Sequence, residues 1–143
     1  CALPIFCDVD DKLMDTPFLK AILQPLVENS IKHGFQRKQQ ERCISILIRQ
    51  NNDKLHIEVM DNGNGMEEEQ LASLHTEIRG IFENPMKCLA EANHIGIKNV
   101  VQRMYLEYGE AFHVKIISTA GYGTRIELEI PEEGERREEK PYV

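Results

Sequence analysis

The apolar positions of this chain follow two different periods, and their order predicts the secondary structure. A helical spacing begins at Thr16-Pro17, which suit the N-cap and first position of a helix, and it continues to Gly34. Its apolar positions are Phe18, Leu19, Ile22, Leu23, Leu26, Val27 and Ile31. Pro25 lies inside this predicted helix, where a proline costs about 3 kcal/mol and favours a kink.

Two further helices are predicted in the second half of the chain. The segment from Met66 to Ile78 is acidic at its front, which suits a helix N-terminus. The other helix is predicted by apolar residues at i, i+3, i+4, i+7 and i+11 that end before Gly109, namely Ile97, Val100, Val101, Met104 and Tyr108. Between these helices, Arg79 to Asn93 follows neither period, and we expect a long loop that can move.

Alternation with a period of two predicts the strands. The predicted strands are Leu3–Cys7, Ile44–Ile48, Leu55–Val59, Phe112–Ile116 and Ile126–Ile130. Asn51-Asn52-Asp53 and Gly121-Tyr122-Gly123 separate the last four into two hairpins. Because the strands alternate rather than being apolar throughout, we predict a mixed sheet with helices on one face and water on the other, a two-layer α/β sandwich.

Composition and charge fit one soluble domain. A chain of 143 residues buries roughly 68–70% of its unfolded surface on folding. The hydrophobic content of 41% and charged content of 29% are ordinary for a globular protein. A formal charge of −7 argues against a nucleic-acid partner, and no apolar run or signal sequence points to membrane contact. We assign residues 1–131 to the domain and 132–143 to a charged, solvated tail.

The cysteines and the first residue bear on context. The four cysteines form no CxxC pair, so reduced thiols in a reducing cytoplasm are the expected state. The chain begins with Cys1 rather than Met, which suggests a piece of a longer protein.

A polar band lies along the first predicted helix. Glu28, Asn29, Lys32 and His33 are neighbours at i, i+3 and i+4 spacing, and Asn29 falls at the edge of the apolar stripe. The band is either a solvated face, with Asn29 capping a local backbone group, or a cation and phosphate site. In the second case the amide and carboxylate oxygens suit Mg²⁺ and Lys32 suits phosphate.

Three glycine segments could bind a ligand or could simply be turns. Asp61-Asn62-Gly63-Asn64-Gly65-Met66 follows a strand, Gly96 opens the third helix, and Gly121-Tyr122-Gly123-Thr124 joins two strands. Glycine lets a ligand approach the backbone closely, and a helix N-terminus attracts anions. None of these segments completes GxGxxG or a Walker P-loop.

In this order the segments resemble the N, G1, G2 and G3 boxes of the GHKL ATPase superfamily, most closely in its YesM/LytS-like sensor histidine kinases. The matching segments are LQPLVENSIKHG (Leu23 to Gly34), DNGNGM (Asp61 to Met66), HIGIKNVVQRMYLEYG (His94 to Gly109) and GYGT (Gly121 to Thr124). The resemblance spans about Pro4 to Pro131. It implies the Bergerat α/β sandwich and a catalytic domain that transfers the γ-phosphoryl group of MgATP to a histidine.

The resemblance also implies roles for individual residues. Asn29 would hold Mg²⁺ at the ATP phosphates, Lys32 and His33 would lie near those phosphates, and Glu28 would assist proton removal. Asp61 would accept the adenine amine, with Thr124 supporting it through water. The remaining implied nucleotide contacts are Gly63, Gly65, Met66, Gly96, Ile97, Gly121 and Gly123, with 79–93 as the ATP lid.

Two departures from the family pattern matter. His94 stands where many relatives have a second glycine, which would stiffen the hinge of the lid. None of the five histidines lies in a phosphoacceptor motif. The phosphorylated histidine would therefore lie on an upstream dimerisation segment, and a response regulator would follow. We expect a monomeric cytoplasmic domain from a membrane-anchored homodimer. The alternatives are an ATP hydrolase of the gyrase or Hsp90 type and a nucleotide-dependent protein-binding module.

Overall fold

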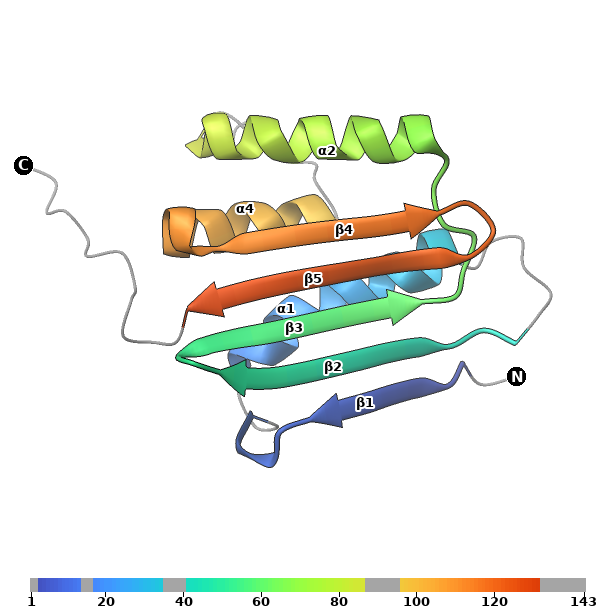
Figure 1. The fold of residues 1–143 in the computed structure, drawn as a ribbon, viewed down its shortest axis with the longest axis horizontal. Helices are drawn as coiled ribbons and strands as arrows, with labels where there is room; N and C mark the ends of the chain where they lie inside the picture. The colour runs from blue at the N-terminus through green and yellow to red at the C-terminus, as the bar shows by residue number, and fades with distance from the viewer. Residues whose placement is uncertain (1–2, 14–16, 35–40, 87–95, 132–143) are drawn as a thin grey trace, which may run out of the picture.

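The computed structural model describes residues 3–13, 17–34, 41–86 and 96–131, in which helices cover a five-stranded sheet (Figure 1). The elements are β1 (Ile5–Val9), α1 (Pro17–Asn29), β2 (Ile44–Asn51), β3 (Lys54–Asp61), α2 (Glu68–Glu83), α4 (Ile97–Tyr108), β4 (His113–Thr119) and β5 (Gly123–Pro131). A π-helical turn, Ser30–Gly34, continues α1, and 3-10 turns lie at Asp11–Leu13 and Gly109–Ala111. The predicted cap at Thr16 and the tail 132–143 lie outside the described residues.

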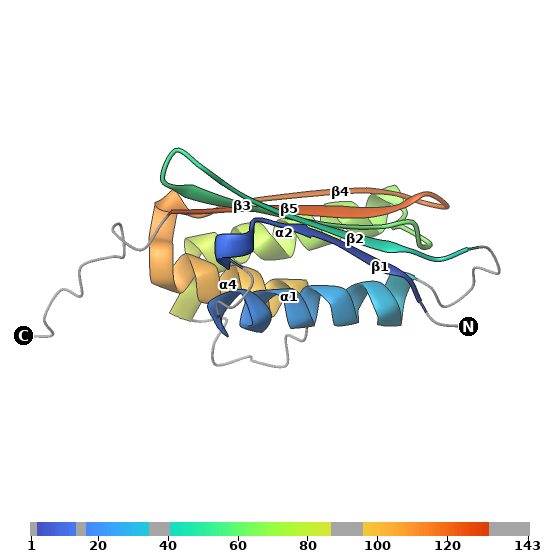
Figure 2. The same cartoon turned by 90° about the horizontal axis from the view of Figure 1, so that it is seen from below.

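The sheet has the order β1-β2-β3-β5-β4 and is mixed. β1 pairs parallel to β2, and every other neighbouring pair is antiparallel. Seen along its edge, the sheet carries α1, α2 and α4 on the same side (Figure 2). This confirms the predicted two-layer α/β sandwich.

The core lies between the helices and the alternating residues of the central strands. Ile48, Ile57 and Leu128 are opposite one another across β2, β3 and β5, and all three are buried. From the helices, Leu26 of α1 and Val101 of α4 are fully covered. Each such side chain contributes about 1.5–3 kcal/mol by leaving water, so the period-two pattern fixes which face of the sheet the helices cover.

The predicted bounds of the first strand and of the second helix are wrong. The first strand runs over Ile5–Val9 rather than Leu3–Cys7, because its pairing with β2 starts at Ile5 opposite Ile44. The second helix runs on to Glu83, so the part of the predicted loop 79–93 between Arg79 and Glu83 is helical. Ile78 and Ile81 are both buried one turn apart and extend its apolar face. Residues 87–93 of the predicted lid lie outside the described residues.

A two-residue turn joins β2 to β3. Asn52 and Asp53 have φ values of 48° and 62°, the left-handed conformation that a type I′ hairpin turn needs at both positions. Asn and Asp tolerate this conformation better than other non-glycine residues. The predicted turn is confirmed, with Asn51 still inside β2.

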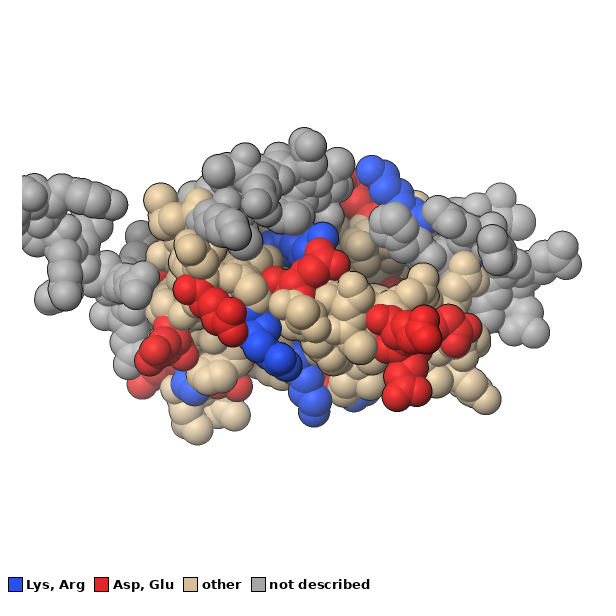
Figure 3. Space-filling model, turned by 90° about the horizontal axis from the view of Figure 1, so that it is seen from above, with Lys and Arg blue, Asp and Glu red and all other residues tan. Residues whose placement is uncertain are grey.

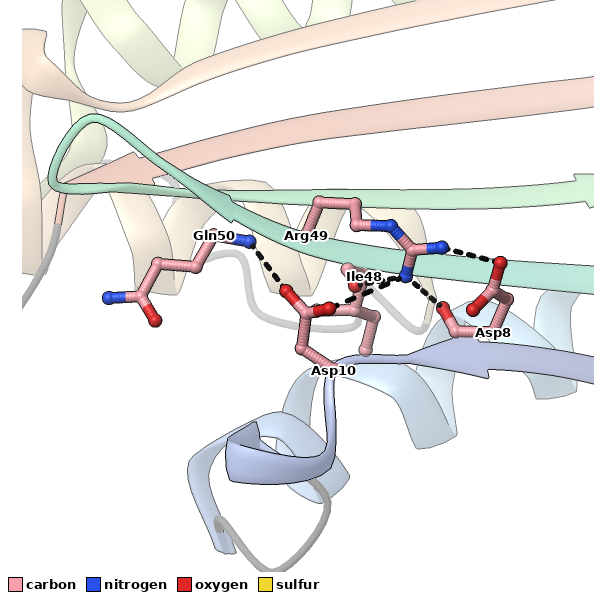
Figure 4. Close-up of polar contacts among 5 residues, drawn as sticks. All are labelled: Asp8, Asp10, Ile48, Arg49 and Gln50. Atoms are coloured by element: carbon pink, nitrogen blue, oxygen red, sulfur yellow. Dashed lines mark hydrogen bonds and ion pairs between the residues drawn. The ribbon is translucent and has the colours of Figure 1, made fainter.

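Polar contacts of Arg49 connect the end of β1 to β2, where the chain leaves the sheet toward α1 (Figure 4). Its guanidinium donates to the Asp8 backbone oxygen at 3.3 Å and to the Asp8 carboxylate at 2.5 Å, and it lies 3.9 Å from the Asp10 carboxylate. The hydrogen bond to Asp8 raises the pKa of Arg49 above its ordinary value. Exposed ion pairs stabilise little, so the contribution of this cluster is mainly to hold the edge strand in register.

Candidate nucleotide-binding site

The centre of the candidate site is the carboxylate of Asp61, the last residue of β3. Asp61 is only 6% exposed, and it accepts two hydrogen bonds of 2.9 Å. Ser30 donates its hydroxyl to Oδ2, and the backbone N–H of Gly63 donates to Oδ1. A buried carboxylate is costly unless hydrogen bonds compensate it, so this one is held in a defined orientation.

Ser30 was missed by the sequence analysis, although its position carries a signal. It lies four residues after Leu26 and eight after Ile22, on the buried stripe of the first helix. Its side chain is 1% exposed. A hydroxyl at such a position needs a hydrogen-bond partner inside the protein, and here that partner is Asp61.

Thr124 lies beside Asp61. The two residues are direct partners in the β3–β5 ladder, and Thr124 is buried. Its hydroxyl is 2.8 Å from that of Ser118, which also donates to the Gly123 carbonyl and accepts from the Met66 N–H at 2.8 Å. Ser118 was also missed, although the period of two in its strand places it on the inward face.

Gly65 and Gly123 are glycines because other backbone atoms occupy the space of a side chain. A Cβ at Gly65 would lie 2.0 Å from the Thr119 carbonyl oxygen, and one at Gly123 would lie 2.0 Å from the Asp61 carbonyl oxygen. Both have positive φ. These contacts pack the chain around Asp61, while the predicted approach of Gly65 to a base stays a prediction. Gly121, by contrast, is exposed, and its N–H donates to the Asn64 carbonyl at 2.7 Å.

Asn29 and Gly96 come together at the other end of the site. A Cβ at Gly96 would lie 3.2 Å from the Asn29 Oδ1 atom, and the φ of Gly96 is 92°. Gly96 is the residue before α4, and Ile97, the first residue of α4, is buried in the core. The amide of Asn29 therefore lies against the N-terminus of a helix, where unpaired N–H groups favour anions.

Two other residues of the polar band, Glu28 and Lys32, lie at the surface. Glu28 is exposed and accepts a 3.1 Å hydrogen bond from Gln24 along the surface of α1. Lys32 is exposed on the π-helical turn. The side chain of His33 and the whole of His94 lie outside the described residues. The site thus has a buried end at Asp61 and a more open end along α1.

Charge is distributed unevenly around the helices. Figure 3 shows acidic side chains gathered where α2 begins, and Glu67, Glu68 and Glu69 are exposed there. Negative charge at this end complements the dipole of α2.

Within residues 3–13, 17–34, 41–86 and 96–131, no group of three or more His, Cys, Asp or Glu side chains could hold a metal ion. The Asn29 Oδ1 atom beside Gly96 is an oxygen donor at the open end.

The fold and this arrangement define the class of protein. The family model described as histidine kinase-, DNA gyrase B-, and HSP90-like ATPase matches residues 14–134, and the chain belongs to this family. An uncharacterised sensor-like histidine kinase of Staphylococcus epidermidis is 32% identical over 133 residues, which are 90% of this chain and 23% of that protein. The sensor protein LytS of Oceanobacillus iheyensis is 33% identical over 123 residues, 86% of this chain and 20% of that protein.

Solved structures show the same fold. The histidine kinase domain of a blue-light-activated histidine kinase from Erythrobacter litoralis matches with a TM-score of 0.60 and 16% identity, over 91% of this chain and 52% of that one. The catalytic domain of histidine kinase ThkA matches with a TM-score of 0.54 and 17% identity, over 91% of this chain and 78% of that one.

Two facts limit what these similarities cover. The chain spans about a fifth of the length of the sensor proteins that it resembles in sequence. In the described part of the chain, the helices are too short or too polar to cross a lipid bilayer.

Proposed function

We propose that this domain binds MgATP and transfers its γ-phosphoryl group to a histidine on another segment of the sensor kinase to which it belongs. The single observation that carries the proposal is the buried, doubly hydrogen-bonded carboxylate of Asp61 beside Thr124. A carboxylate has about four acceptor positions. Two of these positions accept hydrogen bonds from the protein, so the others can accept a hydrogen bond from the exocyclic amine of adenine.

The opposite end of the site suits the phosphates. The Asn29 amide lies against Gly96, at the N-terminus of α4, so an oxygen ligand and a group of backbone N–H donors are close together. Asn29 would hold Mg²⁺, which keeps several waters and takes its other ligands from substrate phosphate oxygens. When bound, the metal neutralises phosphate charge. Lys32 follows Asn29 on the same segment and would add positive charge, and His33 would lie near the phosphates.

The transfer step needs an acceptor that reaches the open end of the site. An unprotonated imidazole nitrogen of the acceptor attacks the γ-phosphorus, and ADP leaves with the electron pair of the broken P–O bond. The proton on the other imidazole nitrogen passes to a carboxylate, and we assign this role to Glu28. Its exposure on α1 supports the assignment, because a group that serves an acceptor on another segment must be accessible.

Calorimetric titration with a non-hydrolysable ATP analogue and Mg²⁺ tests the binding site. The wild-type domain should bind, and Asp61→Asn should weaken binding roughly 10- to 100-fold, the range for losing a hydrogen bond to a charged group. Asp53→Asn is the matched control, because it makes the same chemical change in the exposed β2–β3 turn, where Asn is well tolerated. Equal affinity of wild type and Asp61→Asn would exclude Asp61 as the adenine acceptor.

Labelled ATP together with the upstream histidine-containing segment of the full protein tests the chemistry. Label transferred to protein supports the kinase, free phosphate supports a hydrolase, and neither supports a nucleotide-dependent binding module. Glu28→Gln should bind ATP normally and slow the transfer. A response regulator would accept the phosphoryl group next, in a homodimeric, membrane-anchored sensor with this domain in the cytoplasm.

A further inference from the structure

We propose that Ser30 is a positioning residue that holds Asp61 for the exocyclic amine of adenine, and that it thereby determines the preference for adenine over oxopurine nucleotides. The proposal rests on the proposed function, since it assumes that Asp61 meets the base. It concerns a residue that touches the carboxylate rather than the reacting atoms.

The contact is short, buried and spans the fold. The Ser30 hydroxyl donates to Asp61 Oδ2 at 2.9 Å across 31 positions of sequence, and Ser30 is 1% exposed. The Gly63 N–H donates to the other oxygen. Each carboxylate oxygen therefore has one donor from the protein, and the carboxylate plane is fixed by donors on two sides.

This arrangement keeps Asp61 an acceptor toward a ligand. The exocyclic amine of adenine can donate to the remaining lone pairs, whereas the carbonyl oxygen of hypoxanthine or guanine would face a second acceptor without a proton between them. Without the Ser30 hydroxyl, Oδ2 loses its donor inside the protein. The carboxyl group can then rotate away from the orientation that meets the amine. Removing the Ser30 hydroxyl should therefore reduce the preference for adenine over oxopurine nucleotides.

Ser30 also connects the two ends of the site. It directly follows Asn29 and begins the π-helical turn Ser30–Gly34, an irregularity that is common at functional sites. The hydrogen bond to Asp61 thus fixes the turn to the end of β3 while Asn29 faces Gly96. Ser30, which orients Asp61 toward the base, and Asn29, which would face the phosphates, are consecutive residues.

Calorimetric titration of ADP and of IDP, each with Mg²⁺, provides the test, because IDP carries a carbonyl oxygen where ADP carries the amine. Wild type should prefer ADP. Ser30→Ala should weaken ADP binding roughly 10-fold and IDP binding much less, so that the affinity ratio shrinks. Ser30→Thr keeps the hydroxyl and should restore the preference. Ser45→Ala, which lies on the opposite face of the sheet from Asp61, should leave both affinities unchanged.

The outcomes separate this inference from the proposed function. Wild type that binds neither nucleotide overturns both. Wild type that binds ADP, with Ser30→Ala lowering ADP and IDP affinity equally or not at all, overturns the role of Ser30 and leaves the nucleotide site standing. If Ser30→Ala does not fold, Ser30→Cys replaces it, because its weak S–H donor should give a ratio between those of wild type and a variant without a donor.

Discussion

Gly123→Ala is expected to destabilise the domain by forcing β3 away from β5. Gly123 begins β5 with a φ of 128°, and a Cβ there would lie 2.0 Å from the Asp61 carbonyl oxygen and 2.9 Å from the Asn62 Cα. Both obstacles are backbone atoms, so no side chain can rotate to relieve the contact. Gly121 is a natural control because its φ is also positive, at 82°, and nothing lies within 4 Å of its Cβ position.

The two substitutions differ by a steric contribution whose size follows from these distances. Gly121→Ala should cost only the strain of a positive φ, about 1–2 kcal/mol. At Gly123, whose φ of 128° lies further from the left-handed region that L residues adopt, at least this strain applies. The Asp61 carbonyl must also retreat by about 1 Å to reach the shortest contact that real Cβ atoms make, 3.0 Å. Opening this rung of the ladder weakens backbone hydrogen bonds of about 0.5–1.5 kcal/mol each. We therefore expect a total of about 3–5 kcal/mol, a large part of a typical domain's stability.

Urea unfolding of the variants, followed by circular dichroism, measures these costs. Gly123→Ala should lower the free energy of unfolding by at least 2 kcal/mol more than Gly121→Ala, as the strain and ladder contributions above imply. It should also weaken ADP binding, because the displaced residue is Asp61. Equal destabilisation by the two substitutions would refute the argument that the Asp61 backbone requires glycine at position 123.

Three further substitutions probe the helix, the hydroxyl network and the outer face. Gly80→Ala in α2 meets nothing within 4 Å and should stabilise the domain by about 0.5–1 kcal/mol in urea unfolding. Ser118→Ala removes the partner of the Met66 N–H and of the Thr124 hydroxyl, and should cost about 1–3 kcal/mol in thermal unfolding, while an unchanged melting temperature would contradict this network. The hydrogen bond from Lys54 lowers the pKa of Glu129, so this pair stabilises the domain above the ordinary glutamate pKa and loses its effect as the pH falls through the lowered value. Because the pair is largely exposed, Glu129→Gln should cost less than about 1 kcal/mol at pH 7 and almost nothing at strongly acidic pH, and a cost that grows on acidification would show the opposite sign.

The sequence by itself was sufficient for the architecture. The period of two in β2, β3, β4 and β5 and the helical spacing in α1 and α4 are local signals, because burial on one side of an element repeats with that element's own period. The turn residues Asn52 and Asp53 are likewise selected by backbone conformation at the turn itself. These features need no knowledge of what packs against what.

The end of α2 was predicted less well, because the local helical signal is weak there. The segment after Ile78 contains Gly80, which weakens a helical signal, yet Ile81 is buried and the Asn84 N–H closes the last turn on the Gly80 carbonyl. Tertiary packing of the apolar face overrode the weak local propensity.

The order of the four boxes along the chain and their family resemblance were enough to predict Asp61 and Thr124 as site residues. Only the tertiary structure decided that Ser30 donates a hydrogen bond to Asp61 and that position 123 requires glycine because the Asp61 backbone lies against it. Both facts depend on contacts between residues far apart in sequence. No local period encodes such a contact, because the partner of a buried hydroxyl, and the atom that fills the space beside a glycine, are set by how β3, β5 and α1 are brought together.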